Sequence, residues 1–120
     1  MGKILDFETF KLNKDFKYVY GRGKNYVFPA LVVYIRKNRL SYCRIGVTVS
    51  KKVGNAVKRN RAKRVIMAAF YETKHLINGY DIVFVARGKT PFVKSYMLKS
   101  YMEKVFRNVI QNEKSHNKVN

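Results

Sequence analysis

The chain has 120 residues, a formal net charge of +19 at pH 7 and a pI near 10.3. Hydrophobic residues make up 47% of it and include nine Tyr and eight Phe, so we expect a folded core and exclude a disordered basic tail. A pI above roughly 9 is typical of domains that bind nucleic acid. We therefore predict one nucleic-acid-binding domain over residues 1–120, with short frayed termini at about 1–6 and 112–120.

Several other classes of protein do not fit this sequence. The one cysteine, Cys43, cannot form an internal disulfide and fits a reducing compartment. Cys43, His75 and His116 lack the spacing of zinc ligands. The longest apolar run, Tyr26 to Ile35, is too short to span a bilayer, and the N-terminus lacks a secretory signal pattern. We expect a cytoplasmic protein that contacts no membrane and takes no small-molecule substrate.

The first predicted element is a short helix. Asn13 is a typical N-cap residue, and the helix is expected to run to about Tyr20 and to stop at the following Gly-Arg-Gly sequence, 21–23. The residues before it lack clear periodicity, although four apolar side chains there are candidates for packing against the domain: Leu5, Phe7, Phe10 and Leu12.

Two strands are predicted next, over Leu31 to Arg36 and over Tyr42 to Ser50, where apolar and polar residues alternate. The loop between them, Lys37 to Leu40, predicts a hairpin in which the two strands pair antiparallel. A further short strand is possible at 23–28 or near Lys89 to Phe92.

A loop at 51–54 and an N-cap at Asn55 open a second helix that runs to about Ile77. The third strand covers Tyr80 to Ala86 and the last helix covers roughly Ser95 to Gln111. The order α-β-β-α-β-α predicts an α+β sandwich with helices on a small sheet. The second helix has an apolar stripe expected to face the core: Ala62, Val65, Ile66, Ala69, Phe70, Thr73, Leu76 and Ile77.

Acidic residues are absent between Asp15 and Glu72, where 14 Lys and Arg residues occur. Seven of these cations precede or open the second helix, although a cation at a helix N-terminus costs about 0.3–1 kcal/mol. The same terminus favours phosphate, because free N–H groups and cations converge there. A solvated helix face is the alternative, but such faces usually include acids. The predicted nucleic-acid contacts are Lys51, Lys52, Asn55, Lys58, Arg59, Asn60, Arg61, Lys63 and Arg64.

The segment 50–64, SKKVGNAVKRNRAKR, resembles the signature of the protein subunit of bacterial ribonuclease P, and Arg59-Asn60-Arg61 matches that family's RNR motif. Length, basicity and element order agree as well, so the resemblance covers roughly residues 12 to 110. It implies a small mixed sheet with an unusual left-handed βαβ crossover, whereas general rules favour a right-handed one. Met67 stands where the family frequently has an arginine.

The resemblance also implies a function. The family's protein subunit assembles with a catalytic RNA that removes the 5′ leader of precursor tRNA, using Mg²⁺ held mainly by the RNA. The seven acidic residues of this chain are scattered, so no carboxylate cluster predicts a metal-dependent nuclease in the protein itself. The protein alone is therefore expected to be a binding subunit without catalytic residues or a metal site.

Aromatic residues offer a second candidate site. Phe16 and Tyr20 share a helix face, and Tyr34, Thr48 and Ser50 lie on the non-core faces of the two strands. From the residues alone, core packing is the stronger interpretation, and base stacking is the alternative. The resemblance reverses this order, because matching aromatics in the family line a cleft that contacts the single-stranded leader.

Three other functions remain as alternatives. A ribosomal or general RNA-binding protein would use the same basic helix without any preference for a 5′ leader. A helix-turn-helix DNA reader fits less well, because strands flank the basic helix where another helix should lie. A stand-alone nuclease lacks the clustered acids that its metal ions would need.

Overall fold

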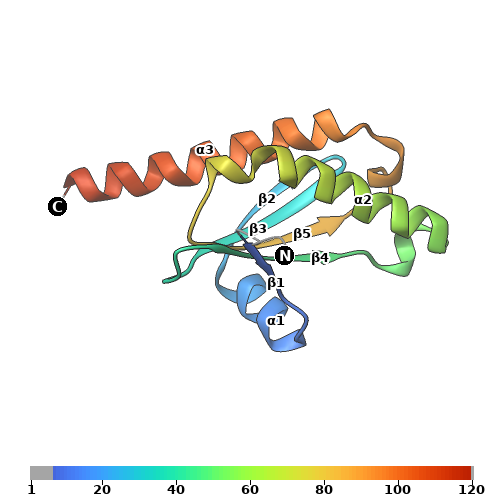
Figure 1. The fold of residues 1–120 in the computed structure, drawn as a ribbon, viewed down its shortest axis with the longest axis horizontal. Coiled ribbons are helices and arrows are strands. Elements are labelled where there is room, and N and C mark those ends of the chain that lie inside the picture. The colour runs from blue at the N-terminus through green and yellow to red at the C-terminus, as the bar shows by residue number, and fades with distance from the viewer. Residues whose placement is uncertain (1–6, 120) are drawn as a thin grey trace, which may run out of the picture.

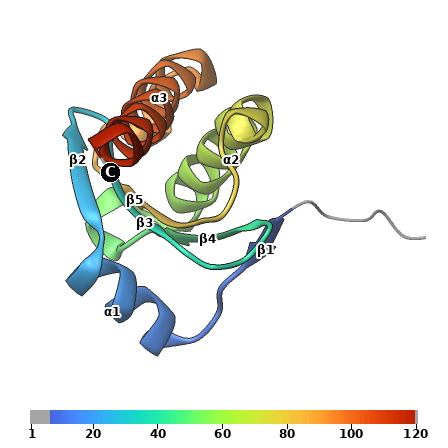
Figure 2. The same ribbon diagram turned by 90° about the vertical axis from the view of Figure 1, so that its left-hand side faces the viewer.

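Five strands form one mixed sheet with helices on both faces (Figures 1 and 2). The computed structural model describes residues 7–119 and the side chains of residues 7–114. The η elements are short 3₁₀ helices. In chain order the elements are β1 (Phe7–Thr9), α1 (Asn13–Arg22), β2 (Lys24–Phe28), β3 (Leu31–Lys37), β4 (Cys43–Thr48), η1 (Lys51–Val53), α2 (Ala56–Thr73), η2 (Lys74–Leu76), β5 (Tyr80–Ala86), η3 (Thr90–Phe92) and α3 (Ser95–Val119).

The strand order across the sheet is β1-β4-β5-β3-β2. β3 pairs antiparallel with β2 and with β5, whereas β4 pairs parallel with β5 and with β1. The predicted hairpin between β3 and β4 is therefore wrong, because β5 lies between them. β5 is buried on both faces, and such a strand is most stable in the centre of a sheet with a partner on each side. The β3–β4 connection crosses the start of β5, where Asn38 N donates to Gly79 O at 2.8 Å.

β4, α2 and β5 form a βαβ unit whose two strands are adjacent and parallel. Figure 1 shows both strands running in the same direction, with α2 returning above them, and Figure 2 shows β5 on the left of β4 when both strands point away from the viewer. This arrangement makes the crossover left-handed, as the resemblance implied. Most such connections are right-handed.

α2 and α3 cover one face of the sheet and α1 covers the other (Figure 2). The predicted stripe of α2 faces the main core, where Ala62, Ile66 and Phe70 are fully buried. The Phe70 ring meets Phe7 edge-on with centroids 5.2 Å apart. A second, smaller cluster under α1 contains Phe10, Val19 and Val83. The sheet is thus packed on both faces, and α1 is held by its own set of apolar contacts.

Several element ends differ from the predictions. Asn13 is the first residue of α1 rather than its N-cap; Leu12 occupies the cap position without a side-chain hydrogen bond, and it is 56% exposed instead of packed. β1 was not predicted, whereas β2 matches the possible strand at 23–28. Such short strands form through their partners, and local sequence carries little sign of them.

The predicted frayed tail at 112–120 is wrong for 112–119, because α3 continues to Val119. Glu113 accepts a 2.6 Å hydrogen bond from the Tyr80 hydroxyl and forms an ion pair with Lys37, so tertiary contacts extend the helix past its apolar stripe. Residues 1–6 and 120, including Leu5, lie outside the described residues.

Candidate nucleic-acid interface

The start of α2 is fixed by local hydrogen bonds, as the sequence predicted. Asn55 is the N-cap, and its Oδ1 accepts from the backbone N–H of Lys58 at 3.0 Å. Just before it, η1 carries Lys51 and Lys52, and Gly54 adopts a φ of 143°, a value that favours glycine. Figure 1 shows α2 beginning beyond the end of β4, so its first turns lie past the end of that strand.

The segment 51–64 carries seven Lys and Arg residues, most of them exposed. Six of them are exposed and Arg59 is half-buried. No carboxylate among the described side chains forms an ion pair with any of the seven. We call these residues the basic rim: Lys51, Lys52, Lys58, Arg59, Arg61, Lys63 and Arg64. Asn60, between the two arginines of the motif, is exposed on the same helix.

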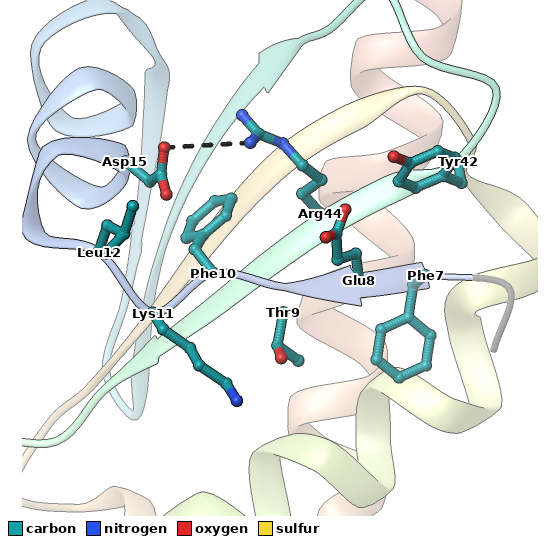
Figure 3. Close-up of a pocket in the computed structure, with 9 residues that line it drawn as sticks. All are labelled: Phe7, Glu8, Thr9, Phe10, Lys11, Leu12, Asp15, Tyr42 and Arg44. Atoms are coloured by element: carbon teal, nitrogen blue, oxygen red, sulfur yellow. Dashed lines mark ion pairs between the residues drawn. The ribbon is translucent and has the colours of Figure 1, made fainter.

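Two of the described acidic residues pair with an arginine outside the basic rim. Arg44 on β4 donates to both carboxylate oxygens of buried Asp81, at 3.0 and 2.7 Å, and lies 4.0 Å from Asp15. The hydrogen bond with Asp81 raises the pKa of Arg44 despite the opposing effect of burial. A cavity of about 780 Å³ lies beside this group, lined by β1, the start of α1 and Arg44 (Figure 3). None of the predicted RNA-contacting residues lines that cavity.

The predicted aromatic residues do come together, on the face of the sheet that α1 covers. The rings of Tyr20 and Tyr34 meet edge-on with centroids 4.8 Å apart, and Phe16 lies 6.5 Å from Tyr20. The Tyr20 hydroxyl shares a 2.8 Å hydrogen bond with Thr48 Oγ1. We call Phe16, Tyr20, Tyr34 and Thr48 the aromatic surface. Ser50 does not join it; it is exposed beyond the end of β4.

The core-packing interpretation of these aromatics holds in part. Each of the three rings is half-buried: it packs against the cluster of Phe10, Val19 and Val83 and keeps part of its area open to solvent. Phe16 also depends on Gly46, because a Cβ at that position would lie 2.5 Å from the Phe16 ring. The aromatic surface is therefore held in place by packing, and it remains accessible.

Strand register adds residues that the sequence did not indicate. Thr48 pairs with Val85, Val85 with Val32, and Val32 with Val27, so one row crosses four strands on the α1 face. With neighbouring strands about 4.8 Å apart, the row is about 14 Å long. Val27 at its far end is 64% exposed. Finding this row required knowing that β5 is central.

The fold and these two regions define a class of protein: a small α+β protein with one mixed sheet and a cationic helix start suited to polyanions. The sequence profile of the family described as Ribonuclease P matches residues 6–116. The Ribonuclease P protein component of Clostridium beijerinckii is 41% identical over 109 residues, covering 84% of each chain. That of Clostridium botulinum strain Loch Maree is 50% identical over 80 residues, covering 65% of this chain and 72% of the relative.

Solved structures agree. The RNase P protein of Staphylococcus aureus superposes with a TM-score of 0.72 at 33% identity, covering 84% of this chain and 94% of that one. The RNase P protein of Thermotoga maritima superposes with a TM-score of 0.73 at 30% identity, covering 84% of this chain and 96% of that one. The chain belongs to the ribonuclease P protein family. This membership confirms the resemblance and the α+β fold, and it implies a role in tRNA processing within a ribonucleoprotein nuclease.

Two further features bear on other functions. In the part of the chain that the structure describes, no helix is long and apolar enough to cross a membrane. Within the same part, no three His, Cys, Asp or Glu side chains lie close enough together to hold a metal ion.

Proposed function

We propose that the protein binds the catalytic RNA of ribonuclease P through the basic rim and holds the 5′ leader of precursor tRNA on the aromatic surface. The observation that carries the proposal is the uncompensated charge at the start of α2. Family membership supports both partners, because the relatives are components of ribonuclease P. Their bacterial origin also supports a bacterial cytoplasmic site of action.

The rim is suited to phosphate for a physical reason. The first N–H groups of α2 have no carbonyl partner within the helix, and the helix dipole adds partial positive charge. Lys51 and Lys52 in η1, just before this end, and Arg59 and Arg61 in the first two turns of α2 add cations. Each phosphate that a cation neutralises releases condensed counterions, which favours binding at low salt. A long RNA supplies many phosphates at once, so the unpaired charge of the rim becomes binding energy.

The aromatic surface is suited to an unpaired strand. Stacking on an aromatic ring contributes about 1–3 kcal/mol per base and tolerates any base. Such tolerance fits a leader whose sequence differs between precursors. Thr48, and Ser50 just beyond the strand, add hydroxyls that can bond phosphate or base edges. Only residues 49–54 separate Thr48 from the cap of α2, so one RNA assembly can contact both regions.

The described acidic side chains do not form a cluster suited to magnesium. Of the six acidic residues with described side chains, five are paired with Lys or Arg: Asp15, Glu72, Asp81, Glu103 and Glu113. Mg²⁺ prefers clustered oxygen ligands, which this arrangement does not supply. We therefore propose that Mg²⁺ is held mainly by the RNA subunit, which carries out the cleavage, and that the protein alone is inactive.

Reconstitution tests the proposal. The protein is mixed with a bacterial ribonuclease P RNA at low Mg²⁺, and cleavage of precursor tRNA is followed. We expect the protein to accelerate cleavage, since it neutralises phosphates that Mg²⁺ would otherwise have to screen. An equally basic RNA-binding protein of another fold is the control. Equal acceleration by that control would favour a general RNA-binding function instead.

The leader contact is tested separately with Phe16→Ala and Tyr34→Ala. Each variant should bind precursor tRNA more weakly in the holoenzyme by about 1–3 kcal/mol and bind mature tRNA nearly as well as the unmodified protein does. Tyr71→Ala is the matched control, because Tyr71 is 50% exposed on α2, away from the aromatic surface. Equal weakening of both ligands would contradict the proposed leader site.

A further inference from the structure

We propose that Phe92, with Tyr96 four residues further along the chain, forms a second stacking site that takes an unpaired base of the ribonuclease P RNA held by the basic rim. Phe92 is 67% exposed and Tyr96 is 69% exposed, although large aromatic side chains are usually covered. A single exposed apolar residue needs no explanation. Here, however, the ring lies at the start of α2, and the local structure fixes it there.

The turn that carries Phe92 is rigidly anchored. Thr90 is fully buried; its hydroxyl donates to Ala30 O at 2.6 Å and accepts from the backbone N–H of Arg87 at 2.7 Å. Pro91 is also buried, and Phe92 N donates to Lys89 O at 3.0 Å. Two buried residues thus hold the backbone while the next side chain projects into solvent. The exposure of Phe92 belongs to the fold and is not the result of a loose loop.

The surroundings of the ring carry positive charge. Lys58 Nζ lies 5.5 Å from the centroid of the Phe92 ring, a cation–π contact that joins η3 to the basic rim. The stem of Lys58 packs against Gly54, where a Cβ would lie 2.7 Å from its Cδ. Lys89 and Lys94 flank the turn, both exposed and without an ion pair to any described carboxylate.

A flat apolar ring among unpaired cations matches one ligand chemistry well. A nucleotide presents a planar base for the ring and a phosphate for Lys58 in the same unit. An apolar protein partner would have to bury Lys58 and Lys89 without counter-charge, which is costly. The site adjoins the first turn of α2, so the proposal rests on the proposed function: the RNA on the basic rim supplies the base.

A fluorescence experiment tests this directly, because the sequence contains no tryptophan. Phe92→Trp introduces a single indole, and Tyr71→Trp is the matched control: Tyr71 is also exposed and also has a lysine, Lys74, 5.5 Å from its ring centroid. Adding ribonuclease P RNA should quench the indole at position 92 through base stacking and leave the one at position 71 unchanged. Precursor tRNA alone should quench neither.

Affinity measurements complete the test. Phe92→Ala should lower affinity for ribonuclease P RNA by about 5- to 150-fold with no change in the salt slope, since stacking releases no counterions. Phe92→Tyr should restore binding, and thermal unfolding should stay unchanged. An unquenched indole at position 92 with RNA bound overturns the inference and leaves the proposed function intact. Quenching only by precursor tRNA overturns the assignment to the RNA subunit. Failure of the unmodified protein to bind the RNA overturns the proposed function itself.

Discussion

The basic rim and the aromatic surface are built in opposite ways. The rim depends on local structure: one N-cap, one 3₁₀ turn and a helix whose cations bond to no described carboxylate. The aromatic surface depends on contacts between distant parts of the chain, such as Tyr20 with Thr48 and Phe16 over Gly46. A cationic surface therefore needs little tertiary support, whereas a surface of aromatic rings needs packed residues beneath it. For this reason we expect substitutions to affect the basic rim and the aromatic surface independently.

The largest expected effect comes from Gly46→Val. A Cβ at Gly46 would lie 2.5 Å from the Phe16 ring and 2.7 Å from the Phe10 ring, so α1 must shift. We expect a loss of about 1–3 kcal/mol in the free energy of unfolding. Precursor affinity should fall while the salt slope for the RNA subunit stays the same. Denaturant unfolding and filter binding measure the two effects.

Gly21→Ala is the control for that substitution. Gly21 also lies in α1, but a Cβ there meets nothing within 4 Å. Alanine should stabilise the helix by about 0.5–1 kcal/mol and leave both affinities unchanged. If Gly46→Val weakened binding of the RNA subunit as much as binding of the precursor, the two regions would not be independent.

A smaller effect is expected at the rim. Arg61→Ala should lower affinity for the RNA subunit and reduce the slope of log K against log salt by about one, because one phosphate contact is lost. Stability should hardly change, since Arg61 is exposed and makes no ion pair with a described residue. Lys104→Ala on α3 removes an equally exposed cation away from the rim and should leave the slope unchanged. If the unmodified protein and both variants had the same salt slope, Arg61 would not contact a phosphate directly.

The smallest effect is expected for Tyr20→Phe. It removes the hydrogen bond to Thr48 and keeps the ring that packs against Tyr34. The free energy of unfolding should fall by about 0.5–1.5 kcal/mol. Precursor affinity should remain nearly unchanged, because the ring provides the stacking. A fall as large as that of Tyr34→Ala would mean that the hydroxyl itself contacts the leader.

The sequence predicted the helices and the three long strands well, because each carries its own periodicity or cap. Asn55 and the stripe from Ala62 to Thr73 are local signals, and the structure confirms both. The strand order was predicted wrongly, because the placement of β5 between β3 and β4 depends on which strand is buried on both faces. A loop of the right length does not contain that information.

The candidate site shows the same contrast between local signals and long-range pairing. Every cation of the basic rim could be named from its position in α2 or in the turn just before it, whereas the row through Val85, Val32 and Val27 depends on register across the sheet. The ion pair between Arg44 and Asp81 could not be predicted either, since the two residues are 37 positions apart in the sequence. Pairings over such distances follow from the assembled sheet and cannot be inferred from spacing.

The pairing of Arg44 with Asp15 and Asp81 also has a kinetic consequence. The two carboxylates and one guanidinium of this group leave a net charge of −1 on that side, whereas the cations at the start of α2 form no ion pair with a described carboxylate and keep a positive field. If the basic rim binds RNA as proposed, an approaching RNA is drawn toward that end of the molecule and oriented before contact. The speed of encounter should accordingly decline steeply as ionic strength rises, whereas the lifetime of the complex should respond more to the packing of rings.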